Sequence, residues 1–205
     1  MRELYPTPSK EDIALLEPFE RLGLSHIELV ATAGQAEQAL DVLASSAVLG
    51  FDTESKPTFA RNEVSGGPHV VQLSTARRAF VFQLHDARCS ALVAGLLSAE
   101  SVLKVGFGLG DDRRRILGKL GVEPRGVLDL NHLFQERGYR KDMGVKAAVA
   151  LLFNRRFIKS RKATTSNWAQ PRLTEAQLVY AANDAYAALR VFHALESQPG
   201  GDAAA

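Results

Sequence analysis

The chain has 205 residues and a formal net charge of +2, and 46% of its residues are hydrophobic. This composition is ordinary for a globular protein whose core forms without disulfides. The single cysteine, Cys89, excludes an internal disulfide and fits a reducing compartment. No secretory signal or membrane-spanning apolar run is recognisable, so we expect a cytoplasmic protein. The mildly basic balance permits a phosphate-rich partner but does not require one.

The first half of the chain reads as strands and helices in alternation. Residues 1–25 form a polar, proline-containing extension, in which Ser9 is placed to cap a short helix before Pro18. Apolar runs bounded by turn residues then predict strands, and apolar residues at helical spacing predict helices. In chain order we expect a strand at 26–32, a helix at 34–46, a strand at 47–54, a loop at 55–68, and strands at 69–74 and 79–84 that pair as a hairpin beside strand 47–54.

The second half is richer in helices. In chain order we expect a helix at 86–98, a strand at 102–107, helices at 110–120, 129–138 and 144–152, an irregular basic stretch at 154–167, and a helix at 174–196. Thr174 and Gln177 fit a capping box at the start of that last helix. We expect the Gly/Ala-rich tail at 198–205 to be disordered. The order of elements predicts one α/β domain over residues 26–197, with a mixed sheet flanked by helices.

Two acids end the apolar strand at 47–54. Side chains alternate between the faces of a strand, so Asp52 and Glu54 share one face and Phe51 and Thr53 the other. Like charges about 6–7 Å apart repel by roughly 2–3 kcal/mol at an effective dielectric constant of about 20. The pair therefore favours a bound cation, although a solvated strand end explains this motif equally well on its own.

A glycine-rich turn follows the strand at 102–107. It superficially resembles a dinucleotide-binding loop, but Asp111 stands where a third glycine is expected. Two carboxylates there would repel a pyrophosphate, although they suit the start of a helix as caps. Asp112 shares the inward edge of the helix with Ile116, whereas Asp111 points elsewhere and is the better candidate for a plain cap.

The last helix carries Tyr180 and Asp184 four residues apart, and hence on one face. The alanines around them allow close packing against another element. An ordinary core helix explains this segment equally well on its own.

Together, however, the three acidic segments favour a metal centre. Oxygen ligands without a His or Cys cluster favour Mg²⁺ or Mn²⁺ over Zn²⁺, and two such ions suit attack on a phosphodiester.

In this order the motifs resemble those of the DEDDy-type 3′–5′ exonucleases with a ribonuclease H-like fold, such as ribonuclease D and the Werner-syndrome exonuclease domain. The resemblance covers residues 26–195. It rests on Phe51-Asp-Thr-Glu54, Val105-Gly-x-Gly-Leu-x-x-Asp112 and Tyr180-Ala-Ala-Asn-Asp184, with support from Val70-Val-Gln-Leu73 and Ser166-Asn-Trp168. From the length of the sequence we expect none of the C-terminal helical domains of full ribonuclease D, and hence substrate binding by this domain or a partner.

The resemblance implies a role for each motif residue. Asp52, Glu54 and Asp184 would hold a first Mg²⁺ or Mn²⁺, and Asp52 would bridge to a second ion that Asp112 reaches through water. Tyr180 would orient the attacking water at the 3′ end of a DNA or RNA strand, with release of 5′-mononucleotides. No histidine base is then required.

Substrate contacts are expected near the same motifs. Thr53 and Phe107 are placed to touch the terminal base or sugar, although core packing is the stronger interpretation of Phe107. Phosphate contact is expected from the basic stretch, namely Arg155, Arg156, Lys159, Arg161 and Lys162. Trp168 fits a structural anchor better than a stacking platform, and Arg113–Arg115 fit a solvated helix face.

Two other functions were weighed. One is a nuclease-like domain that binds nucleic-acid ends without cutting, which the presence of all five motif residues disfavours. The other is a nucleotide-cofactor enzyme that uses the loop at 106–112, which the missing glycine and the two acids disfavour. The residues do not distinguish DNA from RNA as the substrate.

Overall fold

Six strands form one mixed sheet in the computed structural model, which describes residues 5–58, 66–139 and 141–197. The strands lie in the spatial order β1-β4-β3-β2-β5-β6. Their bounds are β1 Ile27–Val30, β2 Val48–Glu54, β3 Val70–Ser74, β4 Ala79–Gln83, β5 Leu103–Gly106 and β6 Val127–Asp129. The five strands expected from the sequence are confirmed.

The acidic strand β2 lies inside the sheet, as its apolar residues predict. It pairs with β3 in the antiparallel direction and with β5 in the parallel direction. The predicted hairpin of β3 and β4 is also present, with Ser74 opposite Ala79. Strand β6 was missed, because its three residues run directly into a helix and Asp129 caps that helix.

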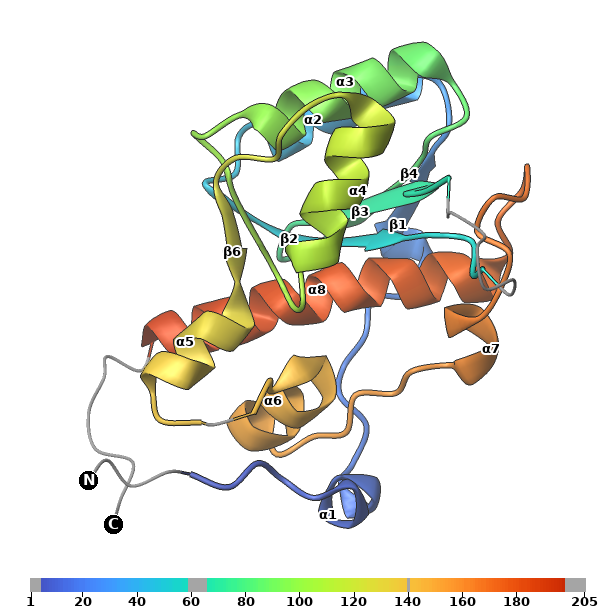
Figure 1. Ribbon diagram of the computed structural model, residues 1–205. Coiled ribbons are helices and arrows are strands. Elements are labelled where there is room, and N and C mark those ends of the chain that lie inside the picture. Colours follow the sequence, from blue (N-terminus) through green and yellow to red (C-terminus); the bar gives the residue numbers. More distant parts are fainter. Residues whose placement is uncertain (1–4, 59–65, 140, 198–205) are drawn as a thin grey trace.

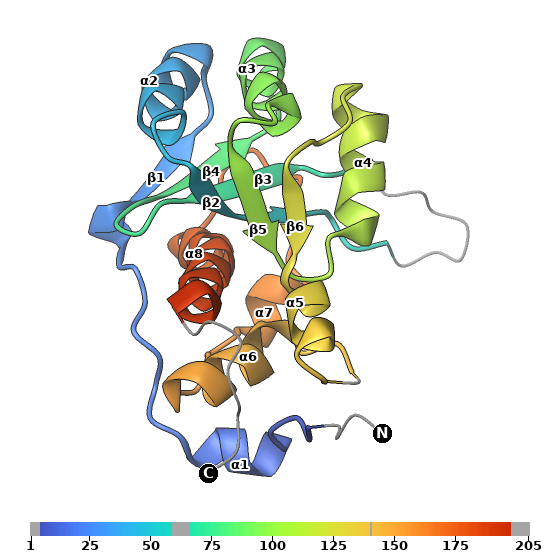
Figure 2. The ribbon, with the colours of Figure 1, turned by 90° about the vertical axis from the view of Figure 1, so that its left-hand side faces the viewer.

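Helices cover both faces of this sheet. Their bounds are α1 Lys10–Leu15, α2 Ala33–Leu43, α3 Ala87–Ser98, α4 Gly110–Leu120, α5 Leu130–Glu136, α6 Gly144–Phe153, α7 Arg161–Thr164 and α8 Glu175–Ser197. Helices α2, α3 and α4 lie on one side of the sheet, and α8 runs along the other (Figure 1). Helices α1, α5, α6 and α7 lie beyond α8, which the turned view in Figure 2 also shows. Helix α7 is a short helix within the stretch that was predicted to be irregular.

Two hydrophobic cores fill these layers, one on each face of the sheet. Phe51 and Phe82 belong to the core under α2 and α3. Val70 and Val105 belong to the core around α8, which also buries Trp168 completely. Trp168 is therefore a structural anchor, as expected. The single α/β domain with its mixed sheet confirms the fold class predicted from the sequence.

The N-terminal extension packs onto the domain. Ser9 caps α1, as its position predicts. Phe19 and Leu22 are buried in the core around α8. The side chain of Asn183 on α8 bonds both the N–H and the carbonyl of Leu22, at 2.8 and 3.1 Å. The predicted disordered tail at 198–205 lies outside the described residues, and the boundaries at 25 and 197 stay predictions.

Helix α8 approaches β2 very closely at Gly50. A Cβ atom on Gly50 would overlap the carbonyl group of Ala185 and touch Leu189. Gly50, Asp52 and Glu54 share the face of β2 that meets α8, because strand side chains alternate. The missing side chain at residue 50 thus brings the helix that carries Asp184 against the strand that carries the other two acids.

We predict that Gly50→Ala destabilises the protein by about 1–3 kcal/mol, because the added methyl group must push α8 away from β2. Denaturant unfolding measures the change. Gly95→Ala is the matched control: a Cβ there meets nothing within 4 Å in helix α3, so we expect a gain of about 0.5–1 kcal/mol. Equal stabilities of the two variants would contradict the close packing at Gly50.

Candidate metal centre

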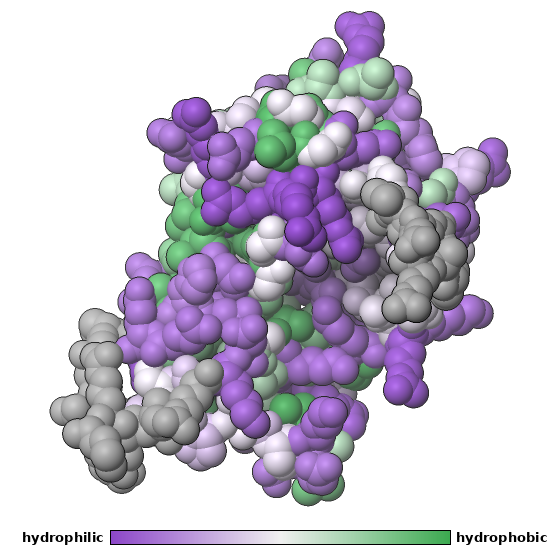
Figure 3. Space-filling model, in the orientation of Figure 1, coloured by the Kyte–Doolittle hydropathy of each residue, from purple (hydrophilic) through white to green (hydrophobic). Residues whose placement is uncertain are grey.

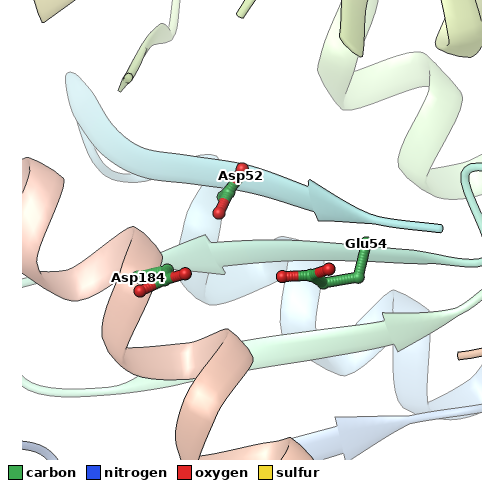
Figure 4. Close-up of side chains that lie close together, drawn as sticks. All are labelled: Asp52, Glu54 and Asp184. Carbon is green, nitrogen blue, oxygen red and sulfur yellow. The ribbon is translucent and has the colours of Figure 1, made fainter. Parts of the chain in front are cut away.

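Three carboxylates from two distant parts of the chain converge at the contact between β2 and α8. Asp52, Glu54 and Asp184 each offer an oxygen atom, and these atoms all lie within 4.8 Å of one another. Figure 4 shows the two acids of β2 and the one of α8 pointing toward a common point. The same-face prediction for Asp52 and Glu54 is thereby confirmed.

Burial gives this cluster unusual electrostatics. Burial first, and then the charges of Asp184 and Asp112, raise the pKa of Asp52 well above its usual value. Burial and the charges of Asp52 and Asp184 raise the pKa of Glu54 to about 9. Burial also raises the pKa of Asp184 against the opposing effect of Lys159. The cluster therefore resists carrying its full negative charge unless cations are close.

Lys159 is the basic residue that reaches the cluster most directly. Its Nζ lies 2.7 Å from Oδ2 of Asp184 and 5.5 Å from the ring centre of Tyr180. Burial lowers the pKa of Lys159, but Asp184, Tyr180 and Asp52 raise it by more, so the pKa lies above its ordinary value. The ammonium group is thus charged and sits between the two residues that share one face of α8.

Tyr180 lies one helical turn before Asp184, as its spacing predicts. Its hydroxyl oxygen accepts a hydrogen bond of 3.1 Å from Thr164. Burial and the charge of Asp184 raise the pKa of Tyr180 well above its ordinary value, so the hydroxyl keeps its proton. Thr164 was not singled out from the sequence, where it stood in a polar stretch without a motif.

Asp112 does not join the group of three. It approaches β2 from the α4 side, where it accepts a short hydrogen bond from Thr53, which faces away from Asp52 and Glu54. Its charge nevertheless raises the pKa of both those acids, so it lies near them. Asp111 is exposed and pairs with Arg114 at 3.0 Å, which agrees with the choice of Asp112 as the site acid.

A cavity of about 310 Å³ opens beside the cluster. It is lined by Asp52, Asp184, Lys159, Phe107 and Asn131, among others. Figure 3 shows this face of the molecule to be largely hydrophilic and hollowed near its centre. Phe107 also stacks on Phe134, with the two ring centres 6.4 Å apart, so its ring both packs in the core and faces the cavity. Asn131 was missed: its Oδ1 accepts from the N–H groups of Met143 and Gly144, which sequence spacing does not reveal.

The basic residues predicted to contact phosphates lie at different distances from the carboxylates. Arg156 donates to the carbonyl of Ala14 at 2.7 Å, which fixes it to the N-terminal segment and not to the cavity. Arg155 is exposed and bonds its neighbour Asn154. Arg161 and Lys162 are exposed on α7, the helix that also supplies Thr164. Only Lys159 of this group reaches the carboxylates.

The donor atoms fit a hard divalent cation. All three are carboxylate oxygens, which Mg²⁺ and Mn²⁺ prefer. The carboxylate oxygens of Asp184 are buried, and the side chains of Lys159 and Tyr180 bond this carboxylate. Such oxygens are costly to bury unless a cation or donor faces them.

Known proteins share this combination of fold and sequence. Residues 27–198 match the sequence model of a family described as 3′–5′ exonuclease. A 3′–5′ exonuclease of Arabidopsis thaliana is 26% identical over 155 residues, which cover 75% of this chain and 54% of that protein. The chain thus spans about half the length of this relative.

Solved structures agree in fold. The EXO domain of Nibbler from Aedes aegypti is 23% identical, with a TM-score of 0.72, and the match covers 87% of this chain and 90% of that one. Ribonuclease D of Trypanosoma brucei in complex with RNA U12 is 20% identical, with a TM-score of 0.75, and the match covers 93% and 66% of the two chains.

The chain therefore belongs to the 3′–5′ exonuclease family, and its fold is that of the ribonuclease D-like members. The resemblance drawn from the three motifs is confirmed at this level. Among the described residues, no helix is long and apolar enough to cross a lipid bilayer.

Because the pKa of Glu54 is raised, we predict that Glu54→Gln increases the free energy of unfolding in the absence of divalent cations, by an amount that depends on pH. With a folded pKa of about 9 and an unfolded value near 4.5, the folded state binds more protons between these pH values. Wild-type stability therefore falls as the pH rises through this window, whereas glutamine does not titrate. We expect the variant to be stabilised, and by more at pH 8 than at pH 5. Urea unfolding in EDTA at both pH values measures this. A gain that shrinks with rising pH would contradict the assignment.

Proposed function

We propose that this protein is a metal-dependent 3′–5′ exonuclease that hydrolyses terminal phosphodiester bonds of DNA or RNA and releases 5′-mononucleotides. The observation that carries this proposal is the convergence of Asp52, Glu54 and Asp184 beside a cavity, in a chain of the exonuclease family. The DEDDy assignment, the two-ion mechanism and a cytoplasmic location belong to the same proposal.

The acidic residues hold the cations in this proposal. Asp52, Glu54 and Asp184 would hold one Mg²⁺ or Mn²⁺, and Asp52 together with Asp112, the latter through water, would hold a second. Such ions would supply an activated water for the attack and would stabilise the charge on the leaving oxygen. Asp112 would then share its oxygen atoms between the water that links it to the second ion and the hydroxyl of Thr53.

Tyr180 orients the attacking water. Its hydroxyl is protonated, accepts a hydrogen bond from Thr164 and bonds Asp184 in the structure, so it could donate to a water once a cation takes over that carboxylate. The tyrosine and Asp184 face the same side of α8, so the oriented water lies next to the carboxylates. No histidine is needed as a base.

The cavity beside the cluster holds the terminal nucleotide. Its volume of about 310 Å³ lies at the lower end of the range for small-ligand sites. Phe107 offers an aromatic surface to the base, and Lys159 offers a positive charge to a phosphate. Arg155, Arg161 and Lys162 remain proposed contacts farther along the strand, and Thr53 remains a proposed contact of the terminal base or sugar. Arg156 is excluded, because it is bound to Ala14.

A digestion assay on matched single-stranded DNA and RNA oligonucleotides with 5′ labels tests the proposal. With Mg²⁺ or Mn²⁺ we expect products that shorten one nucleotide at a time from the 3′ end. The RNA-bound ribonuclease D of T. brucei makes RNA an essential arm. Asp52→Asn and Asp184→Asn should each lower the rate to about 1% of wild type or less, because each removes a charged metal ligand.

Asp111→Asn is the matched control, because this aspartate is exposed, pairs with Arg114 and lies outside the site. It should digest as wild type does. If neither strand shortens with either metal while binding persists, the chain is a non-catalytic end-binding domain and the proposal is wrong. Retention of more than a few per cent of activity in either site variant would overturn the assignment of the ligands.

A further inference from the structure

Lys159 places a positive charge inside the acidic cluster, although it lies on neither β2 nor α8. Its Nζ is 2.7 Å from Asp184, and its charge lowers the pKa of Asp52 and Glu54 as well. One ammonium group thus acts on all three carboxylates of the cluster. The same group lies 5.5 Å from the ring centre of Tyr180.

The backbone sets this inward position. Phe157 and Ala163 are buried on either side of Lys159 and anchor the segment in the core around α8. Ile158 is 43% exposed, whereas Phe157 before it is buried and Lys159 after it contacts Asp184. Ser160 caps α7 immediately afterwards. The side chain of Lys159 is only 28% exposed, so the lysine is held close to the cluster.

A divalent cation and this ammonium group compete for the same oxygen atoms. Mg²⁺ and Mn²⁺ bind carboxylate oxygens at about 2.0–2.3 Å, and an ammonium group already in contact with Asp184 repels a second cation there. Removing the lysine leaves the buried Asp184 without its ion-pair partner, which is destabilising unless a metal replaces the lysine.

We propose that Lys159 is a positioning residue that acts as an internal counter-ion: it offsets part of the negative charge of the Asp52–Glu54–Asp184 cluster when no divalent cation is bound, and it yields Asp184 when one binds. This inference rests on the proposed metal centre. Once released, the ammonium group remains at the wall of the cavity, where it can contact a substrate phosphate.

Lys159→Met tests this, because methionine keeps the length of the side chain and removes its charge. We expect the variant to bind Mn²⁺ about tenfold or more tightly in calorimetry on the full chain without substrate. We expect its melting temperature in EDTA to be several degrees lower than that of wild type. Saturating Mn²⁺ should then stabilise the variant more than wild type, because stabilisation grows with affinity.

Two further variants separate contact from general charge. Lys159→Arg keeps the charge and should stay within about threefold of wild type in Mn²⁺ affinity. Lys146→Met removes an exposed cation on α6 that also lowers the pKa of Asp184 without an ion-pair contact to it. It should change Mn²⁺ affinity by less than about threefold, since exposed charges are screened.

Unchanged Mn²⁺ affinity in Lys159→Met, with only a higher KM for an oligonucleotide, would show a plain phosphate contact and overturn the inference. A melting temperature that is lowered equally with and without Mn²⁺ would show a purely structural lysine and also overturn it. Tighter Mn²⁺ binding in a protein that digests no strand would support the counter-ion and defeat the exonuclease proposal, so the two failures are distinguishable.

Discussion

The contact between β2 and α8 forces three carboxylates together, of which Asp184 is buried and Asp52 and Glu54 are partly buried. Nothing in the chain order keeps Asp184 near Asp52, and their charges oppose the approach. The missing side chain of Gly50 allows the helix backbone to lie against the strand, and the core around α8 holds it there. The apolar packing of α8 thus offsets the repulsion at the site. The raised pKa values of Asp52, Glu54 and Asp184 are the electrostatic consequence of that packing.

Positive charge stabilises such a cluster by offsetting the repulsion among its carboxylates. Lys159, in the segment before α7, supplies one positive charge, and divalent cations supply further positive charge in the proposed active state. The same segment carries Thr164, which bonds the hydroxyl of Tyr180. Charge balance, tyrosine orientation and the wall of the cavity therefore depend on one short stretch, residues 157–164, that packs against α8 through Phe157 and Ala163.

Much of this arrangement could be predicted from the sequence, because local rules fix it. Strand alternation places Asp52 and Glu54 on one face, and helical spacing places Tyr180 beside Asp184. The distinction between Asp111 and Asp112 followed from the same geometry. The capping box at Thr174 is present, with Gln177 bonded in both directions.

Other features depend on tertiary contacts that no local rule encodes. The bond from Thr53 to Asp112 joins residues 59 positions apart. Arg156 and Lys159 look alike in the sequence, yet one binds the N-terminal segment and the other the carboxylates. A backbone bridge to Pro18 holds Arg156 at the N-terminal segment, whereas buried Phe157 and Ala163 flank Lys159. Neither contact can be predicted from periodicity, because the segment is irregular. Strand β6 was missed because three residues give too short a pattern.

The most direct test is the position of Mn²⁺ in crystals soaked with the ion and a 5′-mononucleotide, located by its anomalous scattering. The account predicts an anomalous peak bound by oxygens of Asp52, Glu54 and Asp184, with the nucleotide in the cavity beside Phe107 and with Lys159 withdrawn from Asp184. Peaks confined to exposed acids, with Lys159 still paired to Asp184, would contradict it.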